Sequence, residues 1–333
     1  MTNNIGTAEY CVGIIGTGSY LPERVLTNFD LEKMVDTSDS WIKERTGISE
    51  RRIASEAQTT SDLAARAAKL ALMDAGLKPE EIDLIIVATV TPDYYFPSTA
   101  CLVQHRLQAT KAAAFDISAA CSGFIYALTI AWQHIKTGYY KNALVIGADA
   151  LSKITDWEDR STCVLFGDGA GAFVLGRVEE GGIMSTKMGS DGTGARHLTC
   201  PATYFGDEEL EKRNGAKKAT IWMNGQEVFK FAVNIMPYAF EKALEEAGIG
   251  AEQVDWFIPH QADLRIIEAS AKKFKLPMDK FIVTLQKFGN TSASSIPIAV
   301  DECIRSAKVK KGDILAMAAF GAGLTWGSAV VRL

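Results

Sequence analysis

This chain contains an internal repeat, and the repeat restricts the folds that it can adopt. Ala71-Leu-Met-Asp-Ala-Gly-Leu-Lys-Pro-Glu-Glu-Ile-Asp-Leu-Ile-Ile86 matches Ala243-Leu-Glu-Glu-Ala-Gly-Ile-Gly-Ala-Glu-Gln-Val-Asp-Trp-Phe-Ile258 without a gap, with every pair 172 positions apart. Each copy reads as a helix that ends in Ala-Gly, a polar linker and a buried strand. A repeat distance close to half of the 333 residues indicates two copies of one domain. We expect the halves to be residues 1–180 and 181–333.

Strands and helices alternate along both halves. Near-continuous apolar runs predict buried strands at 12–18, 82–88, 112–115 and 143–147, and another that ends at Pro259. Apolar residues at helical spacing predict helices at 60–76, 123–136, 263–275 and 296–307. We also expect a surface strand at 47–53, a turn at 168–172 and a long polar loop or lid at about 193–220. The alternation is typical of an α/β protein whose sheets are covered on both faces.

The composition argues against several classes of function. The formal net charge is -5, which gives no reason to expect nucleic acid or an anionic membrane as a partner. The 6 cysteines are scattered without a CxxC pair, so neither a disulfide framework nor a metal site is expected. The first residues lack the regions of a signal peptide, and no apolar run is long enough to span a membrane. We therefore expect a cytoplasmic protein with reduced cysteines.

Cys121 lies where a strand is expected to pass into a helix. Its neighbours are small, in Ala119-Ala-Cys-Ser-Gly123, and leave room for a substrate. A helix N-terminus presents free backbone N–H groups and a partial positive charge, which favour the thiolate over the thiol. Cys121 is therefore a candidate nucleophile, although a lone cysteine is more often a small buried hydrophobic residue.

The second half offers two partners for that cysteine. His260 follows the repeated strand, at a position where open α/β sheets place their sites. Asn290 precedes a predicted helix much as Cys121 does. Taken alone, His260 fits a structural histidine that has found a partner, and Asn290 fits a turn residue. Two-fold related halves would nevertheless bring all three residues to one central site.

Several separate motifs, in order, match one family over nearly the whole chain. They are Gly16-Thr-Gly-Ser-Tyr-Leu-Pro22, Trp41-Ile-Lys-Glu-Arg-Thr-Gly-Ile48, Ala119-Ala-Cys-Ser-Gly-Phe124, Asp159-Arg-Ser-Thr162, Gly167-Asp-Gly-Ala-Gly171, Met223-Asn-Gly-Gln-Glu-Val-Phe-Lys230, Pro259-His-Gln-Ala262, Gly289-Asn-Thr-Ser292 and Phe320-Gly-Ala-Gly-Leu-Thr-Trp-Gly327. Through them the chain resembles the thiolase superfamily and, within it, β-ketoacyl-[acyl-carrier-protein] synthase III, the initiating condensing enzyme of bacterial type II fatty-acid synthesis. The resemblance implies a homodimer with a thiolase-like α/β fold, in which two duplicated βαβ halves form a layered α-β-α-β-α sandwich.

The resemblance also implies a catalytic role for each matched residue. Cys121 would attack the thioester of an acyl-CoA primer, and the backbone N–H groups of Cys121 and Ala322 would form the oxyanion hole. Ala322 stands where many relatives have glycine, which is tolerable if only its N–H is used. His260 and Asn290 would hydrogen-bond the thioester oxygen of malonyl-acyl carrier protein and stabilise the enolate left by decarboxylation. The products would be β-ketoacyl-acyl carrier protein, CoA and CO₂, with no metal or cofactor.

Binding roles are implied for residues around this centre. CoA would be bound by Trp41, Arg45 and Arg160. The primer pocket would be lined by Phe96, Leu151, Phe166 and Met223, with Phe96 reaching across the dimer interface. The acidic carrier protein would dock on a set of cations that otherwise reads as a solvated basic face: Lys230, Arg265, Lys272 and Lys273.

Three alternative functions stay open at the level of sequence. A relative with the same fold could condense or transfer other acyl groups, as in polyketide or quinolone starter synthesis. A cysteine hydrolase also uses Cys, His and Asn, but its C-G-[SA]-C-[WY] signature is absent here. A non-catalytic CoA-binding protein would have no use for a nucleophile. Whether the primer is acetyl, straight-chain or branched depends on pocket volume to within a methylene group or two, which no motif encodes.

Overall fold

Two β-sheets form the framework of the computed structural model, which describes residues 10–202 and 219–333. The first sheet has the order β1 (Val12–Tyr20), β7 (Asp168–Arg177), β6 (Ala143–Ala150), β4 (Leu84–Ala88), β5 (Ala113–Ile117). The second has the order β8 (Gly182–Ser190), β13 (Thr325–Arg332), β12 (Ile314–Gly321), β11 (Trp256–Pro259). In both sheets the inner strands that carry the repeat pair in parallel and the outer ones pair antiparallel. Each sheet therefore repeats the topology of the other.

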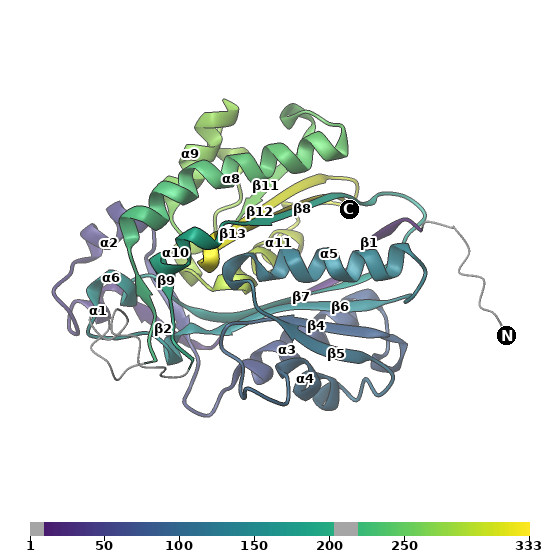
Figure 1. Ribbon diagram of the computed structural model, residues 1–333, viewed down its shortest axis with the longest axis horizontal. Helices are drawn as coiled ribbons and strands as arrows, with labels where there is room; N and C mark the ends of the chain where they lie inside the picture. Colours follow the sequence, from purple (N-terminus) through teal and green to yellow (C-terminus); the bar gives the residue numbers. More distant parts are fainter. Residues whose placement is uncertain (1–9, 203–218) are drawn as a thin grey trace.

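Helices cover both faces of both sheets, so the chain forms five layers (Figure 1). Between the sheets lie α5 (Gly123–Lys136) and α11 (Ser295–Arg305). The outer face of the first sheet carries α3 (Thr60–Ala75) and α4 (Thr99–Leu107), and that of the second carries α8 (Gly225–Ala247) and α9 (Leu264–Phe274). The predicted α-β-α-β-α sandwich is confirmed.

The 172-residue spacing of the repeat extends well beyond the matching sequence. It separates the starts of β4 and β11, at Leu84 and Trp256, and the starts of α5 and α11, at Gly123 and Ser295. Each central helix is also preceded by a short 3-10 turn, η2 (Ala120–Ser122) and η7 (Ser292–Ser294), again 172 positions apart. The second sheet has only an isolated bridge, between Phe257 and Phe281, where the first has β5. The two turns thus occupy equivalent places in the two halves.

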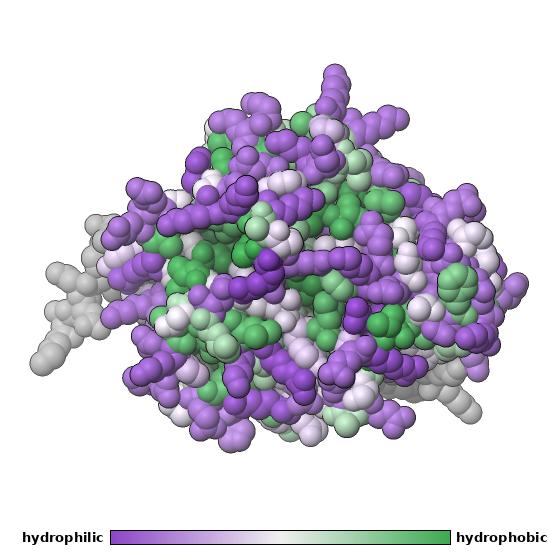
Figure 2. Space-filling model, turned by 180° about the vertical axis from the view of Figure 1, so that it is seen from behind, coloured by the Kyte–Doolittle hydropathy of each residue, from purple (hydrophilic) through white to green (hydrophobic). Residues whose placement is uncertain are grey.

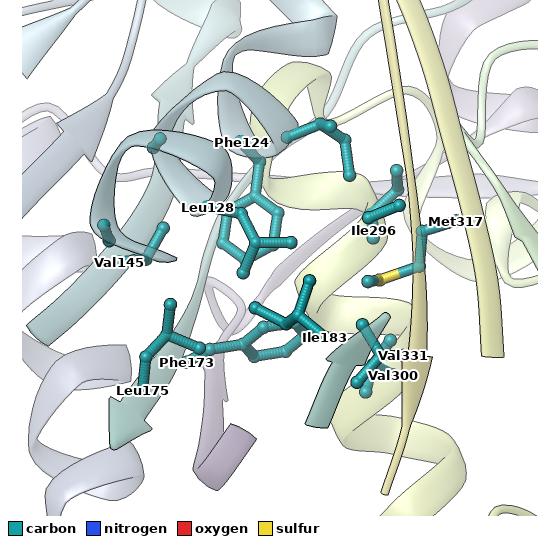
Figure 3. Close-up of a cluster of buried hydrophobic side chains, with 14 of the residues drawn as sticks. Phe124, Leu128, Val145, Phe173, Leu175, Ile183, Ile296, Val300, Met317 and Val331 are labelled. Carbon is teal, nitrogen blue, oxygen red and sulfur yellow. The ribbon is translucent and has the colours of Figure 1, made fainter. Parts of the chain in front are cut away.

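The central helix layer is held by a hydrophobic core shared between the halves (Figure 3). Phe124 and Leu128 of α5 point toward Phe173 of β7, and Ile296 and Val300 of α11 come from the other half. The rings of Phe124 and Phe173 meet edge to face with centroids 4.9 Å apart. Because both helices are buried on nearly every side, their N-terminal turns are fixed relative to each other.

Smaller elements complete the described chain. The short helices are α1 (Asn28–Leu31), α2 (Asp39–Thr46), α6 (Arg160–Cys163) and α10 (Leu285–Phe288). The short strands are β2 (Arg24–Thr27), β3 (Glu50–Ile53), β9 (Leu198–Thr199) and β10 (Trp222–Met223). The other 3-10 turns are η1 (Pro79–Glu81), η3 (Leu151–Lys153), η4 (Gly192–His197), η5 (Ala251–Gln253), η6 (Met278–Lys280) and η8 (Ala322–Leu324).

The structure corrects three local predictions. The turn expected at 168–172 is wrong, because Asp168 opens the continuous strand β7 and the glycines there let α11 pack closely on it. The strand at 112–115 is not buried: β5 is an edge strand, and Phe115 on it is exposed. The strand at 47–53 is shorter and not superficial, since Arg51 of β3 is fully buried. Of the loop expected at 193–220, residues 203–218 lie outside the described residues, and the rest includes η4 and β9.

Candidate active site

Cys121 lies in η2, between β5 and the first turn of α5. The preceding residue, Ala120, has φ +47°, a left-handed conformation that costs a non-glycine residue energy and is often found at functional sites. The end of β12 approaches so closely that a Cβ on Gly321 would lie 2.6 Å from the Cys121 backbone nitrogen. The partly buried thiol is thus presented at the seam between the two halves.

Burial controls the protonation of Cys121. Desolvation raises the pKa of the thiol to about 12, and the buried carboxylate of Asp149 acts in the same direction. The hydroxyl of Ser292 lowers this pKa, but by less than burial raises it. The expectation that the helix N-terminus favours the thiolate is therefore wrong for the unliganded site, because desolvation of the charged form outweighs it. Cys121 is a thiol at rest.

We expect the alkylation of Cys121 by iodoacetamide to report this raised pKa. Because only the thiolate reacts, the rate should rise about tenfold per pH unit from pH 7 to pH 10 without reaching a plateau. At pH 7 the exposed cysteines Cys11 and Cys101 should be labelled before Cys121. Peptide mass spectrometry of a timed reaction series measures all three rates. A plateau for Cys121 below pH 8 would contradict the account.

His260 directly follows β11 and is 1% exposed. Burial lowers its pKa to about 3, so the imidazole is neutral at pH 7. Its Nδ1 lies 2.7 Å from the hydroxyl oxygen of Ser295, the first residue of α11. That oxygen also accepts a long hydrogen bond, 3.5 Å, from the backbone N–H of Gln261, which leaves the Ser295 hydrogen for Nδ1. This arrangement favours the tautomer with its hydrogen on Nε2, where it can be donated to a ligand.

Asn290 is held in a loop between α10 and η7. Its backbone N–H donates to the carbonyl of Leu165, and its carbonyl accepts from the N–H of Gly167. Its side-chain Oδ1 accepts from the N–H of Ser292 at 2.9 Å, which fixes the orientation of the amide. No acceptor within residues 10–202 or 219–333 takes the Nδ2 hydrogens in a hydrogen bond. Asn290 is therefore presented as a neutral donor, like His260.

A buried carboxylate lies beneath these residues. Oδ1 of Asp149 accepts from the N–H of Val90 at 2.8 Å and from the hydroxyls of Thr89 and Thr91. Its Oδ2 lies 3.4 Å from the backbone nitrogen of Ala293, in η7. Burial raises the pKa of Asp149. Asp149 thereby ties the end of β6 in the first half to the turn that follows Asn290 in the second.

Sequence reasoning missed Asp149 and Ser295. A charged residue at the carboxyl end of the apolar strand β6 was a usable signal, the same one that drew attention to His260. The hydroxyl of Ser295 had no such signal, because a serine near a helix start is common for capping alone. Both become visible only when the halves are placed together.

Ala322 opens η8, directly after the strand residue that abuts Cys121. The segment is strained: Gly323 has φ +75° and Leu324 has φ +45°. The carbonyl of Ala322 accepts from the hydroxyl of Thr325 at 3.1 Å. The structure thus brings the backbone of Ala322 into the same seam as Cys121, His260 and Asn290.

Trp41, Arg45 and Arg160 come together on the surface. The guanidinium of Arg160, in α6, lies 4.9 Å from the centre of the Trp41 indole in α2, and that of Arg45 lies 6.0 Å from it. The Arg160 side chain also donates to the carbonyl of Asp36 at 2.6 Å. An aromatic face with two cations beside it suits a planar group that carries phosphates.

Three of the four predicted primer-pocket residues lie in or beside one small apolar cluster. Leu151 and Phe166 pack with Ile221, which sequence reasoning missed, and Phe166 forms an isolated bridge with Asn290. Met223 lies beside them, since it pairs with Leu198, which packs on the cluster. Phe96 does not join them within one chain: it is 87% exposed.

The predicted docking residues lie on two neighbouring helices. Lys230 of α8 and Lys272 and Lys273 of α9 are exposed. Arg265 differs, because Asp263 holds its guanidinium at 2.7 and 3.1 Å and neutralises much of its charge. Lys230 also lines a hollow of about 690 Å³ between α8, η4 and η8, which none of the three predicted catalytic residues lines. Elsewhere on the surface, hydrophobic side chains gather toward the middle of the face opposite that of Figure 1, inside a hydrophilic rim (Figure 2).

The described residues contain no group of three His, Cys, Asp or Glu side chains able to hold a metal ion. Across 10–202 and 219–333, no helix combines the length and the apolar character that a membrane crossing requires.

Comparison with known proteins gives one consistent result. Family models of 3-oxoacyl-[acyl-carrier-protein] synthase III match residues 115–192 and, for the C-terminal part, residues 244–333. The β-ketoacyl-[acyl-carrier-protein] synthase III of Caldanaerobacter subterraneus is 60% identical over 97% of this chain and 98% of its own. The crystal structure of the Aquifex aeolicus 3-oxoacyl-[acyl-carrier-protein] synthase III is 55% identical and matches 97% of this chain and 100% of its own with a TM-score of 0.90. The priming β-ketosynthase of the R1128 polyketide pathway matches 97% of each chain with a TM-score of 0.90 at 36% identity.

Proposed function

Because this chain belongs to the β-ketoacyl-[acyl-carrier-protein] synthase III family, it is an acyltransferase that condenses an acyl-CoA primer with malonyl-acyl carrier protein, and we propose that Cys121, His260 and Asn290 carry out that reaction. The observation that supports these roles is the convergence of one thiol and two neutral donors from the two halves at equivalent helix starts. The hydrolase and binding-module alternatives fall away with family membership.

In the first half-reaction the sulfur of Cys121 attacks the acyl-CoA thioester. The C–S bond to CoA breaks, the acyl–Cys121 bond forms, and the thiol proton ends on the departing CoA sulfur. The backbone N–H groups of Cys121 and Ala322 hold the negative oxygen of the tetrahedral intermediate. Since Cys121 is a thiol at rest, its proton leaves only as the substrate is attacked.

In the second half-reaction malonyl-acyl carrier protein loses CO₂, and the electrons of the broken bond form an enolate. His260 through Nε2–H and Asn290 through its amide hydrogens donate to the enolate oxygen, each worth about 3 kcal/mol if comparable to other oxyanion donors. The enolate carbon attacks the acyl group, and Cys121 leaves as a thiolate that takes up one proton. A neutral imidazole suits this task, because it donates without adding a buried charge.

The experiment that tests this function supplies a panel of acyl-CoA primers with malonyl-acyl carrier protein. Mass spectrometry should detect a β-ketoacyl-carrier protein two carbons longer than the primer, together with one CO₂ per turnover. The same panel ranks acetyl, straight-chain and branched primers. The polyketide starter alternative would be favoured if only unusual primers gave product, and the proposal would fail if none did.

Trp41, Arg45 and Arg160 form the proposed CoA site. We expect Arg160→Ala to raise the KM for acyl-CoA about 10-fold while leaving kcat within about twofold, because it loses a stacked cation near the nucleotide. The variant should match the wild type on an acyl thioester of N-acetylcysteamine, which lacks the nucleotide. Arg66→Ala is a matched control, since Arg66 lies 4.7 Å over the ring of Tyr20 at a different surface. An unchanged KM for acyl-CoA would contradict the assignment.

A homodimer is proposed on two observations. The edge strand β5 has no partner strand on its outer side in the described chain, and unpaired edges favour strand addition. Tyr94, Tyr95 and Phe96 are consecutive exposed aromatic residues next to it in the fold. In the dimer Phe96 would enter the partner's primer pocket. Sedimentation velocity distinguishes the 36.1 kDa monomer from a dimer of twice that mass.

The carrier protein is proposed to dock on Lys230, Lys272 and Lys273, with Arg265 contributing less because of Asp263. These exposed cations on adjacent helices would attract an acidic partner. Charge reversal of Lys272 and Lys273 to glutamate should raise the KM for malonyl-acyl carrier protein and spare acylation by acyl-CoA. An unchanged KM for the carrier protein would count against this surface.

The remaining proposals concern organisation. We propose halves 1–180 and 181–333, supported by the end of β7 at Arg177 and the start of β8 at Gly182. We propose a cytoplasmic location, which all six cysteines, as free thiols, support. We propose that the reaction needs no metal or cofactor, because named side chains and backbone groups fill every step.

A further inference from the structure

Two hydroxyl groups join the halves next to Cys121. The Oγ1 of Thr325, the first residue of β13, lies 3.0 Å from the carbonyl oxygen of Ala119 and 3.1 Å from that of Ala322. The Oγ of Ser122 lies 2.8 Å from Thr325 Oγ1 and 2.8 Å from the same Ala119 carbonyl. Thr325 is therefore in contact with the turn that carries the nucleophile and with the turn that carries Ala322.

The hydrogens of this cluster can be assigned. Each hydroxyl has one hydrogen, and the two carbonyls are acceptors only. Both carbonyls are satisfied only when Ser122 donates to Ala119 and Thr325 donates to Ala322. A side chain without a hydroxyl at 325 would leave the Ala322 carbonyl without this bond and would remove the oxygen that Ser122 contacts. Loss of this one hydroxyl therefore loosens the link between η2 and η8.

Both turns need such an external restraint. Ala120, next to Ala119, has φ +47°, and Leu324, next to Thr325, has φ +45°. Non-glycine residues in this region cost on the order of 1–2 kcal/mol and persist where the surrounding structure fixes them. The backbone N–H groups proposed for the oxyanion hole belong to Cys121 and Ala322, one inside each strained turn.

We propose that Thr325 is a positioning residue that sets the spacing of the oxyanion hole, by holding the carbonyls of Ala119 and Ala322 together. The inference rests on the proposed function and deepens it. Tetrahedral intermediates form in both acyl transfers, so Thr325 acts on the acylation of Cys121 and on the condensation step. The decarboxylation of the malonyl group uses His260 and Asn290, which are held by Ser295 and by the loop next to Gly167, and it does not depend on Thr325.

The test measures acylation and decarboxylation separately in Thr325→Val, which keeps the shape of the side chain and removes the hydroxyl. Single-turnover acylation, followed by intact mass, should slow about 10- to 100-fold, since misplaced oxyanion donors lose part of their effect. The KM for acyl-CoA and the rate of malonyl decarboxylation without primer should stay within about twofold. Thr325→Ser, which restores the hydroxyl, should recover acylation to within about threefold of the wild type.

Each other result has a defined meaning. If the wild type forms no acyl adduct on Cys121, the proposed function itself fails. If the wild type is acylated and Thr325→Val is acylated at the same rate, or loses decarboxylation equally, only the role of Thr325 is overturned. Should Thr325→Val fail to fold in a thermal scan, Ser122→Ala replaces it: that variant keeps one Thr325 bond and should slow acylation, by less than 10-fold, with decarboxylation unchanged. A Ser122→Ala variant with wild-type acylation would then overturn the proposal.

Discussion

Replacement of Cys121 by alanine is expected to lower the kcat for condensation by about 10⁵- to 10⁶-fold, the scale reached when a covalent catalyst loses its nucleophile. Without Sγ there is no acyl-enzyme, and the remaining donors cannot replace a bond. Malonyl decarboxylation should survive in this variant, because the donors of the enolate site come from other residues. A steady-state product assay with acyl-CoA and malonyl-acyl carrier protein measures the loss.

The matched control for that variant is Cys101→Ala. Cys101 is an exposed cysteine on α4, and its sulfur lies 3.6 Å from the carbonyl of Ala114. We expect this variant to keep its kcat within about twofold. If Cys121→Ala retained more than a hundredth of the wild-type kcat, the covalent mechanism would be wrong.

The second large effect is expected from the enolate donors. His260→Ala and Asn290→Ala should each lower the rate of malonyl decarboxylation about 10²- to 10³-fold, which corresponds to about 3–4 kcal/mol of lost oxyanion stabilisation. Acylation of Cys121 should stay within about fivefold of the wild type, because the backbone N–H groups of the oxyanion hole are unchanged. Release of CO₂ from malonyl-acyl carrier protein and single-turnover acylation measure the two steps separately.

A matched control for the two donors is Gln261→Ala. Gln261 is a buried neighbour of His260 whose side chain bonds the carbonyls of Pro259 and Ile282 and the backbone N–H of Thr284. It should reduce thermal stability more than it reduces decarboxylation per folded molecule. Equal losses of acylation and decarboxylation in His260→Ala would refute the division of labour between the two sites.

The repeat in the sequence predicted the architecture better than any single motif did. A conserved spacing between Gly76 and Gly248 can be read from letters alone, and the two halves follow from it. The exposure of β5 could not be read in the same way, because a strand with apolar residues looks alike whether it lies inside a sheet or at its edge. The expected turn at Asp168 failed for a related reason. Its glycines allow α11 to approach β7, and such close packing between distant segments leaves no local signal.

The candidate site shows the same division between local and distant information. Cys121, His260 and Asn290 could be found because each has a distinctive side chain at the end of a predicted element. Asp149, Ser295 and Thr325 were missed, although they tie those elements together, because their roles depend on partners in the other half. The raised pKa of Cys121 was also hidden, since desolvation is set by the packing of both halves.

Intact-mass spectrometry with peptide mapping tests the central claim most directly, namely that Cys121 carries the acyl group between the two half-reactions. The wild-type protein is incubated with an acyl-CoA and then with malonyl-acyl carrier protein. The account predicts a mass gain equal to one acyl group, located on Cys121, that disappears with release of CO₂ when the carrier protein is added. An adduct on another residue, or product formed by a protein that never carries the acyl group, would contradict it.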